Sequence, residues 1–344
     1  MELAHRNHGC RISDEWTFRG YRVLVLENEL LRIGVLLDKG ADIFEFLYKP
    51  VDLDFLWRTP TFLRRRPILD GLPSRIGPFL DTMEGGWQEV LPNGGRVCEY
   101  LGAEFGLHGE VWTLPWEHRI TVDTAQRVEV TLAVRCVRTP LRLERTMSLT
   151  SGQPRLELRE ELVNESDEEL PFMWGHHPLF GPQFVDQDTE LRLPPCEAVV
   201  DLNVDEASRF DPGQHFPWPV GRARDGSDVD VARFPPRDAR ISDMLYLTDL
   251  SEGWAELVNH RRGVGLRLDF DLQTFSCLWA WLEFGGNRGC PSWGRYYAVA
   301  LEPFSSWPAI LTKAMENGTE LRLPPRATRR TWLAASVIGP AVAR

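Results

Sequence analysis

Two positions in this sequence combine residue type and location in a way that suits acid–base chemistry. Glu302 follows the apolar run 296–301 and precedes a proline, so its carboxylate lies at the end of a strand expected to be buried. Burial disfavours the charged form of a carboxyl group and raises its pKa, which suits a general base near neutral pH. A solvated strand end is the alternative for this residue. His177 lies in the segment Met173–Phe180, where Pro178 ends any strand ladder, and functional sites often lie at such ends.

A second histidine, His176, directly precedes His177. Neighbouring residues on a strand point to opposite faces, so only one of the two is expected to face a given pocket. For the same reason the pair is poorly arranged to chelate one metal ion, and we expect no metal site.

Glycine-containing segments supply further candidates. The Gly-Gly pair at 85–86 precedes Trp87 and Glu89, and His108 is followed by another glycine. Glycine adopts backbone conformations that other residues avoid and lets a ligand approach the backbone closely. The alternative for Trp87 is a core residue beside a turn, and the alternative for His108 is a structural histidine. Asp243, which immediately precedes an expected strand, is one more candidate acid.

The elements that must position these residues are mainly strands. Apolar and polar residues alternate with a period of two in several runs, the pattern of a strand with one solvated face. Helical patterns are few, and Pro308–Met315 is the main candidate. No fixed repeat or low-complexity linker divides the chain, so we predict one large antiparallel β-domain. The expected strands are Tyr21–Glu27, Leu30–Leu37, Ala41–Tyr48, Val128–Cys136, Leu141–Leu149, Leu156–Val163 and Val264–Phe270.

Composition limits the classes of function. The 344 residues include 39 Lys and Arg against 50 Asp and Glu, and the net charge of −11 argues against a general binder of nucleic acid or anionic membranes. No apolar run approaches the ~20 residues of a transmembrane helix. The polar N-terminus lacks a signal-peptide core, so we expect a cytoplasmic protein. The six cysteines form no C-x-x-C pair, which favours reduced thiols. Thirteen tryptophans favour either a dense core or a carbohydrate ligand.

The order of these segments resembles the aldose 1-epimerase (galactose mutarotase-like) family over about residues 20–335. The resemblance implies an all-β fold, a large antiparallel β-sandwich with few short helices. It also implies a single domain that spans residues 1–344. The matching segments, in order, are Asp38–Ile43, Leu56-Trp57, the Gly-Gly pair at 85–86, Leu107–Gly109, His177–Phe180, Asp243, Glu302-Pro303 and a closing hairpin at Asn317–Pro325.

This family interconverts the α and β anomers of aldoses, and the resemblance implies a role for each matching residue. Glu302 would remove the proton from the C1 hydroxyl, and His177 would protonate the ring oxygen as the ring opens. His108 and Asp243 would hold sugar hydroxyls and steady the ring oxygen. A paired acid and base is sufficient for this reaction, so no cofactor is expected.

The sequence also departs from the family pattern. Relatives specific for sugar phosphates carry an arginine directly before Gly-Gly, where this chain has Glu84, and a carboxylate there disfavours a phosphorylated sugar. Arg75 could replace that arginine in space, and the additional His176 leaves open which histidine is the acid. Aromatic rings pack on the apolar faces of a pyranose, so Trp87 or Trp112 is expected to line the groove. The candidate substrate-binding residues are therefore Asp243, Trp87, Glu89, His176 and Arg75.

Three other interpretations remain open. A non-catalytic carbohydrate-binding β-sandwich would keep the tryptophans without the acid–base pair. Another carbohydrate-active enzyme on the same fold, such as a glycosidase, would need a second carboxylate beside Glu302, for which Glu89 or Asp243 is available. A metalloenzyme could use His108, His177 and Glu302. The expected partner is a small-molecule sugar, with neither nucleic acid nor membrane, and the expected assembly is a monomer or a homodimer.

Overall fold

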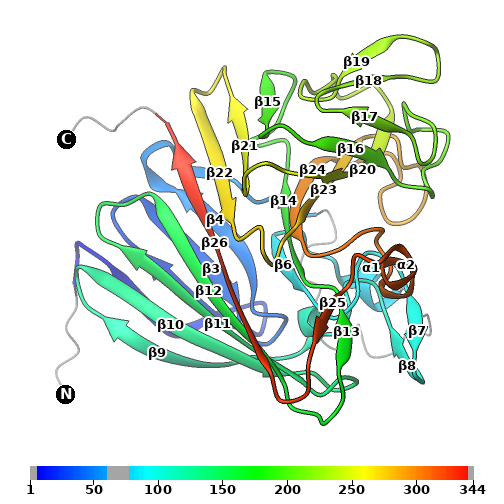
Figure 1. Ribbon diagram of the computed structural model, residues 1–344. Coiled ribbons are helices and arrows are strands. Elements are labelled where there is room, and N and C mark those ends of the chain that lie inside the picture. Colours follow the sequence, from blue (N-terminus) through cyan, green and yellow to red (C-terminus); the bar gives the residue numbers. More distant parts are fainter. Residues whose placement is uncertain (1–5, 60–76, 340–344) are drawn as a thin grey trace.

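Two antiparallel β-sheets dominate the protein (Figure 1). The computed structural model describes residues 6–59 and 77–339, and within these ranges the larger sheet has 12 strands and the smaller has 8. Neither α-helix in these ranges is long and apolar enough to cross a membrane.

The larger sheet has the strand order β1-β2-β3-β4-β6-β14-β24-β23-β20-β16-β17, with β5 paired to β4. Its strands are β1 (Arg11–Phe18), β2 (Tyr21–Glu27), β3 (Leu31–Leu36), β4 (Asp42–Tyr48), β5 (Leu53–Asp54), β6 (Trp87–Val90), β14 (Gly175–Phe180), β16 (Glu197–Val200), β17 (His215–Pro217), β20 (Ile241–Thr248), β23 (Cys277–Phe284) and β24 (Tyr297–Phe304).

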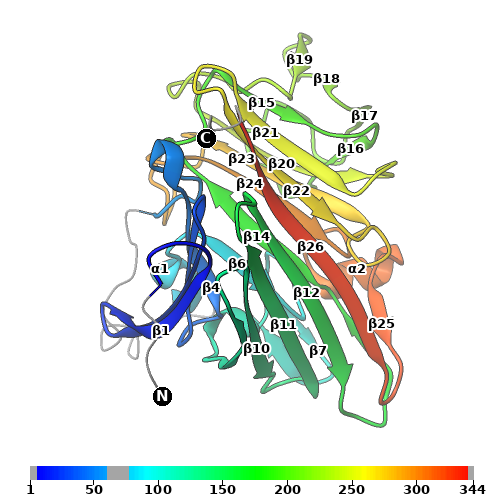
Figure 2. The ribbon, with the colours of Figure 1, turned by 90° about the vertical axis from the view of Figure 1, so that its left-hand side faces the viewer.

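The smaller sheet has the order β15-β21-β22-β26-β12-β11-β10-β9, and Figure 2 shows β26 between β12 and β22. Its strands are β9 (Glu117–Asp123), β10 (Arg127–Arg135), β11 (Leu141–Thr150), β12 (Arg155–Asn164), β15 (Thr189–Arg192), β21 (Trp254–Asn259), β22 (Val264–Phe270) and β26 (Thr328–Ile338).

Short elements extend the loops beyond the two sheets. In Figure 1 the helices α1 and α2 and the β7–β8 hairpin lie on the opposite side of β14 and β24 from β10–β12. The short elements are α1 (Gly77–Thr82), α2 (Leu311–Asn317), the 3-10 turns η1 (Lys49–Val51) and η3 (Val111–Thr113), and the strand pairs β7 (Cys98–Tyr100) with β8 (Ala103–Phe105), β13 (Leu170–Phe172) with β25 (Leu321–Leu323), and β18 (Val220–Arg222) with β19 (Asp228–Asp230).

The main hydrophobic core lies between the sheets. In β10 and β12 the alternate residues are buried, and they pack in one cluster with Leu26 and Ile33 of the larger sheet. Burial of this apolar area, at roughly 25 cal/mol per Å², is the main force that holds the sheets together. The larger sheet therefore has an inner face, turned toward the smaller sheet, and an outer face covered by loops.

The fold class predicted from the sequence is confirmed, and the seven expected strands are present with end shifts of one or a few residues. The helix begins later than expected, at Leu311, because Ile310 is still extended. The expected closing hairpin is wrong: β25 pairs with β13, and the chain then enters the long β26 strand between β12 and β22. The strand β26 was not among those expected from the sequence.

Candidate active site

The central residues of the site form one row across the outer face of the larger sheet. Directly paired residues of neighbouring strands share a face. Gln88 on β6 pairs with His177 on β14, and the register of β14 with β24 places His177 opposite Glu302. Glu302 in turn pairs with Trp279 on β23, and Trp279 pairs with Tyr246 on β20. Side chains that are far apart in sequence are thus aligned by strand register alone.

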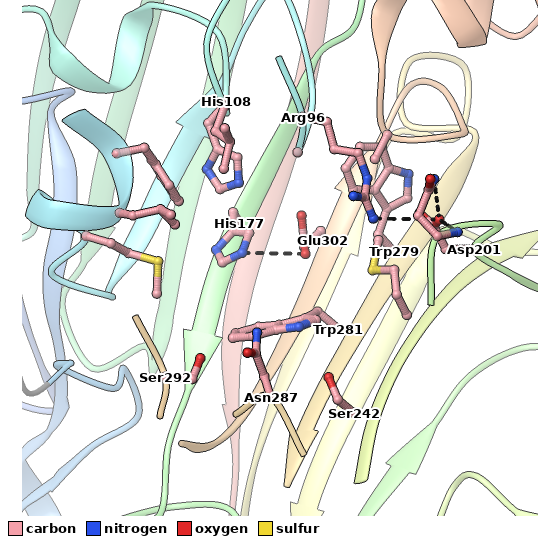
Figure 3. Close-up of a pocket in the computed structure, with 18 of the residues that line it drawn as sticks. Arg96, His108, His177, Asp201, Ser242, Trp279, Trp281, Asn287, Ser292 and Glu302 are labelled. Atoms are coloured by element: carbon pink, nitrogen blue, oxygen red, sulfur yellow. Dashed lines mark hydrogen bonds and ion pairs between the residues drawn. The ribbon is translucent and has the colours of Figure 1, made fainter. Parts of the chain in front are cut away.

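A cavity of about 340 Å³ lies over this row. His108, His177 and Glu302 all line it, and α1 and the segments around Asp201 and Ser292 form its walls (Figure 3). Its volume lies at the lower end of the range of small-molecule sites. The structure thus brings together the three residues assigned to catalysis from the sequence.

His177 and Glu302 face each other inside the cavity. His177 Nε2 lies 3.5 Å from Glu302 Oε1 (Figure 3), and the two residues are only 8% and 3% exposed. Burial raises the pKa of the Glu302 carboxyl well above its usual range. Burial also lowers the pKa of His177, to about 4. Burial therefore favours the neutral form of both residues, and a proton shared by the pair resides mainly on Glu302.

His108 completes the polar group at this end of the cavity. Its ring lies 4.8 Å from the His177 ring and 4.3 Å from the Phe79 ring, measured between centroids. Burial lowers the pKa of His108 well below its usual range, and His177 and Lys39 lower it further. The glycine after it is needed for packing: a Cβ on Gly109, at φ +71°, would lie 2.1 Å from the Leu91 carbonyl oxygen. Gly109 therefore serves a close backbone contact rather than ligand approach.

Two tryptophans line the cavity, but they are not the ones expected from the sequence. Trp279 and Trp281 of β23 contribute to the lining, and the Trp281 ring lies below His177 and Glu302 in Figure 3. Trp87 is fully buried on the inner face. Trp112 packs against Phe79, with a ring-centroid distance of 5.1 Å, outside the lining.

His176 points to the inner face of the sheet, as the alternation rule requires for one of the two histidines. Trp87 Nε1 donates a hydrogen bond to His176 Nδ1 at 3.2 Å, and His176 Nε2 lies 3.1 Å from Glu160 Oε2 on β12. Glu89 accepts a hydrogen bond from the Trp174 indole and pairs with Arg145 at 3.1 Å. We define these residues, which are His176, Glu89, Glu160, Arg145, Trp87 and Trp174, as the inner cluster.

The inner cluster contains two carboxylates and one imidazole within metal-binding distance of one another. The hydrogen bonds of these three residues nevertheless favour binding of a proton over binding of a metal ion. Because Trp87 donates to Nδ1, the proton of His176 lies on Nε2, the nitrogen that a metal between Glu89 and Glu160 would need. Burial raises the pKa of Glu89 and of Glu160 to about 7, and burial lowers that of His176 to about 4. The two acids therefore hold a proton at neutral pH.

Several residues expected at the site lie elsewhere. The Asp243 side chain does not line the cavity; it accepts hydrogen bonds from Ser208 and Arg209. Its neighbours in sequence, Ser242 and Met244, line the cavity instead, because Asp243 is out of phase with them on β20. Glu89 and His176 belong to the inner cluster.

Glu84, which was expected to disfavour a phosphorylated sugar, does not lie at the cavity. Glu84 is buried, lies 2.6 Å from Lys39 Nζ and does not line the cavity, so its charge is not presented to a ligand. Arg75 lies outside the described residues. In the described lining, Arg96 is 3.8 Å from Asp201 at the far side of the cavity from His177 (Figure 3).

A family model matches residues 18–337, and its description is "Domain of unknown function (DUF4432)". The chain belongs to this family. The description names no activity. No curated protein matches the chain.

Solved structures with the same fold support the architecture. A proposed aldose 1-epimerase from Klebsiella pneumoniae subsp. pneumoniae has a TM-score of 0.75 at 15% identity, over 98% of this chain and 86% of that one. A galactose mutarotase-like protein from Clostridium acetobutylicum has a TM-score of 0.66 at 14% identity, over 96% and 99% of the two chains. At these identities the likeness establishes a galactose mutarotase-like β-sandwich fold alone.

Part of the cavity lining could have been found from the sequence. The run Cys277–Phe284 contains Trp279 and Trp281 at a spacing of two, which places both on one face of a strand. The other cavity residues that were missed, such as Asp201, Asn203 and Asn287, lie outside the strands. Their types are common in loops, so no pattern in the sequence distinguishes them.

Proposed function

We propose that this protein is an aldose 1-epimerase that interconverts the α and β anomers of an aldose. The observation that carries the proposal is the pairing of His177 with Glu302, 3.5 Å apart in a cavity of about 340 Å³. The resemblance of the sequence to the aldose 1-epimerase family also supports the proposal, but a fold alone does not define an activity. We further propose that the protein is cytoplasmic, consists of a single domain and is a monomer or a homodimer.

The proposed reaction transfers two protons, forms one C1=O double bond and breaks one bond of the ring. Glu302, in its ionised form, takes the proton of the C1 hydroxyl; a C1=O double bond forms as the bond from C1 to the ring oxygen breaks. The ring oxygen receives a proton from His177. Rotation about C1–C2 then presents the other face of the aldehyde, and ring closure returns both protons in reverse.

Only one proton needs to be shared by the His177–Glu302 pair at the start. Since burial favours that proton on Glu302, the active form with ionised Glu302 and protonated His177 has to be stabilised by substrate. A C1 hydroxyl that donates a hydrogen bond to Glu302 stabilises the carboxylate, and the ring oxygen accepts one from protonated His177. The sugar would then promote the proton transfer that activates the pair.

The remaining lining residues fit the two surfaces of a monosaccharide. The Trp281 ring offers an apolar surface on which one face of a pyranose can pack. Ser242, Asn287 and His108 offer polar atoms for hydroxyl groups. Glu89 and Asp243, the candidates for the second carboxylate of a glycosidase, point away from the cavity, which favours anomerisation over glycoside hydrolysis.

The proposal is tested by adding purified protein to freshly dissolved pure α-anomers of several aldoses, neutral, amino-substituted and phosphorylated, and following optical rotation. We expect a faster approach to the equilibrium rotation with at least one of them. Acceleration with none would overturn the enzymatic proposal. Binding of a sugar by calorimetry without acceleration would instead favour a non-catalytic carbohydrate-binding protein.

A further inference from the structure

We propose that Gln88, held by Lys39 and Asp42, is a positioning residue that fixes the tautomer of His108, so that His108 Nε2 accepts a hydrogen bond from a substrate hydroxyl. The role for substrate rests on the proposed function, whereas the tautomer itself does not. We call Lys39, Asp42 and Gln88 the positioning arm.

The positioning arm is a continuous chain of hydrogen bonds. Lys39 Nζ donates to Asp42 Oδ2 at 3.2 Å, Gln88 Nε2 donates to the same oxygen at 3.4 Å, and Gln88 Oε1 lies 3.2 Å from His108 Nδ1. Gln88 belongs to the row that contains His177 and Glu302, but it does not line the cavity. Its hydrogen bond toward the cavity goes to His108, so we infer that it acts on a ligand through that ring.

The orientation of the Gln88 amide follows from the charge at its other end. Asp42 Oδ2 accepts a hydrogen bond from the Lys39 ammonium group and also faces Gln88 Nε2, so it is the acceptor in both contacts. Burial and Glu84 raise the pKa of Asp42 well above its usual range, and a proton bound by this carboxyl is therefore placed on its other oxygen, Oδ1. The amide nitrogen of Gln88 therefore faces Asp42 and its oxygen faces His108. An oxygen at this position requires a proton on His108 Nδ1, which leaves Nε2 as a bare acceptor.

Burial makes this arrangement persistent. Gln88 is 1% exposed, Asp42 is fully buried and Lys39 is 6% exposed, so water does not compete for the hydrogen bonds. Burial alone would lower the pKa of Lys39, but Glu84 and Asp42 raise it, and the donor stays protonated. Glu84 lies 2.6 Å from Lys39 Nζ, and the Trp112 ring lies 4.9 Å from it.

The consequence for a ligand is a division of roles between neighbouring rings. Protonated His177 would act as a donor and His108, with its pKa well below the usual range, as an acceptor. No described residue bonds to His108 Nε2, and the ring lines the cavity. A hydroxyl group, which can donate, is the group that this site would select.

The tautomer can be measured directly by long-range ¹H–¹⁵N correlation spectra of protein labelled with ¹⁵N-histidine. The His108 signals are identified by their loss in His108→Gln. We expect the Nδ1–H form in the wild type, its retention in Gln88→Glu, which keeps an acceptor oxygen, and its loss in Gln88→Met. Gln183→Met, which removes a glutamine that bonds the Leu56 carbonyl away from the cavity, is the matched control.

In the mutarotation assay we expect Gln88→Met to lower kcat/KM about tenfold, the scale of one hydrogen bond, while Gln88→Glu retains more activity and Gln183→Met is unchanged. An Nε2–H tautomer in the wild type, or an unchanged tautomer in Gln88→Met, would overturn the proposal whatever the activity. An altered tautomer with unchanged kcat/KM would also overturn the role for substrate. Absence of mutarotation in the wild type would contradict the proposed function. The tautomer measurement would then still show whether the positioning arm fixes the tautomer of His108.

Discussion

Strand β14 carries two histidines, one on each face, and each is paired with a glutamate of another strand. On the inner face His176 Nε2 lies 3.1 Å from Glu160 Oε2; on the outer face His177 Nε2 lies 3.5 Å from Glu302 Oε1. Both pairs are buried, and burial shifts the pKa in the same direction in each: the carboxyl is raised and the imidazole is lowered, to about 4. Residue types and pKa shifts therefore do not distinguish the two pairs.

What distinguishes them is the surroundings. The inner pair is enclosed by Trp87 and by the Glu89–Arg145 ion pair. The outer pair borders a cavity, and beyond their mutual contact no hydrogen bond joins Glu302 or His177 to another described side chain. Acid–base groups that border a cavity and have bonding capacity left over are available to a ligand, whereas groups enclosed by other side chains stabilise the fold. Perturbed pKa values indicate a functional site only together with such access.

The largest expected effect is the loss of activity in Glu302→Gln. Glutamine keeps the shape but cannot take a proton, so we expect mutarotation to fall about 10²–10⁴-fold. Glu160→Gln makes the same change in the inner pair and should leave the rate within about threefold, because Glu160 does not line the cavity. Polarimetry on both variants, with circular dichroism as a check on folding, separates the two faces. Equal losses in both would mean that the inner pair takes part in catalysis.

The next effect concerns stability and the inner face. Arg145 is fully buried, pairs with Glu89 at 3.1 Å and lies over the Trp116 ring. Without Arg145 the buried Glu89 carboxyl must either stay charged with no partner or take up a proton, so we expect Arg145→Met to lower the free energy of unfolding by about 3–5 kcal/mol. Urea denaturation measures this loss. The control is Arg142→Met on the same strand, because Arg142 lies on the opposite face from Arg145 and pairs with the partly exposed Glu144. Full recovery of the loss is not expected, but Arg145→Met with Glu89→Gln should be more stable than Arg145→Met alone. A loss below about 1 kcal/mol would mean that the inner cluster contributes little to stability.

How far the sequence could predict this arrangement depends on the interaction concerned. Strand alternation correctly separated His176 from His177, because it depends only on local geometry. Alternation also implies that Asp243 points to the opposite face from Ser242 and Met244. Which of these two faces of β20 borders the cavity could not be assigned without knowing the strand pairing. Trp87 was expected at the ligand because aromatic residues suit both cores and sugars. Packing of the sheets brings β12 and its Glu160 opposite β14. Trp87 is seen to belong to the core because it bonds to His176, which in turn contacts Glu160.

A smaller effect links the inner pair to pH. The pKa of Glu160 is about 7 in the folded protein against an ordinary value near 4.5, so the folded state holds a proton that the unfolded state releases. That contribution to stability is complete below about pH 4.5 and is lost as the pH rises through about 7. His176, with a pKa of about 4, has the opposite effect, but only below its ordinary value of 6.5.

Between pH 6.5 and 8 we therefore expect Glu160 to contribute a fall of about 1 kcal/mol to the wild-type free energy of unfolding. Glu160→Gln should reduce the pH dependence, and Glu89, whose pKa is also about 7, should account for what remains. Urea denaturation at several pH values provides the measurement. Glu161→Gln, which removes the outward-facing neighbour paired with Arg330, should keep the wild-type slope. A slope unchanged in Glu160→Gln would assign the proton to another group.

The smallest effect compares a tryptophan on each face. Trp281→Leu should raise KM about fivefold with little change in kcat, because under the proposed function the ring, which lines the cavity, would contact substrate and transition state alike and its loss would remove uniform binding. Trp87→Phe should leave KM unchanged and lower the free energy of unfolding by about 1 kcal/mol, the contribution of its hydrogen bond to His176 Nδ1. Initial rates over a range of sugar concentrations and urea denaturation give the two quantities for each variant. A raised KM in Trp87→Phe would mean that the two faces of β14 are coupled through the strand, so that the inner cluster sets the position of His177 as well as the stability of the sandwich.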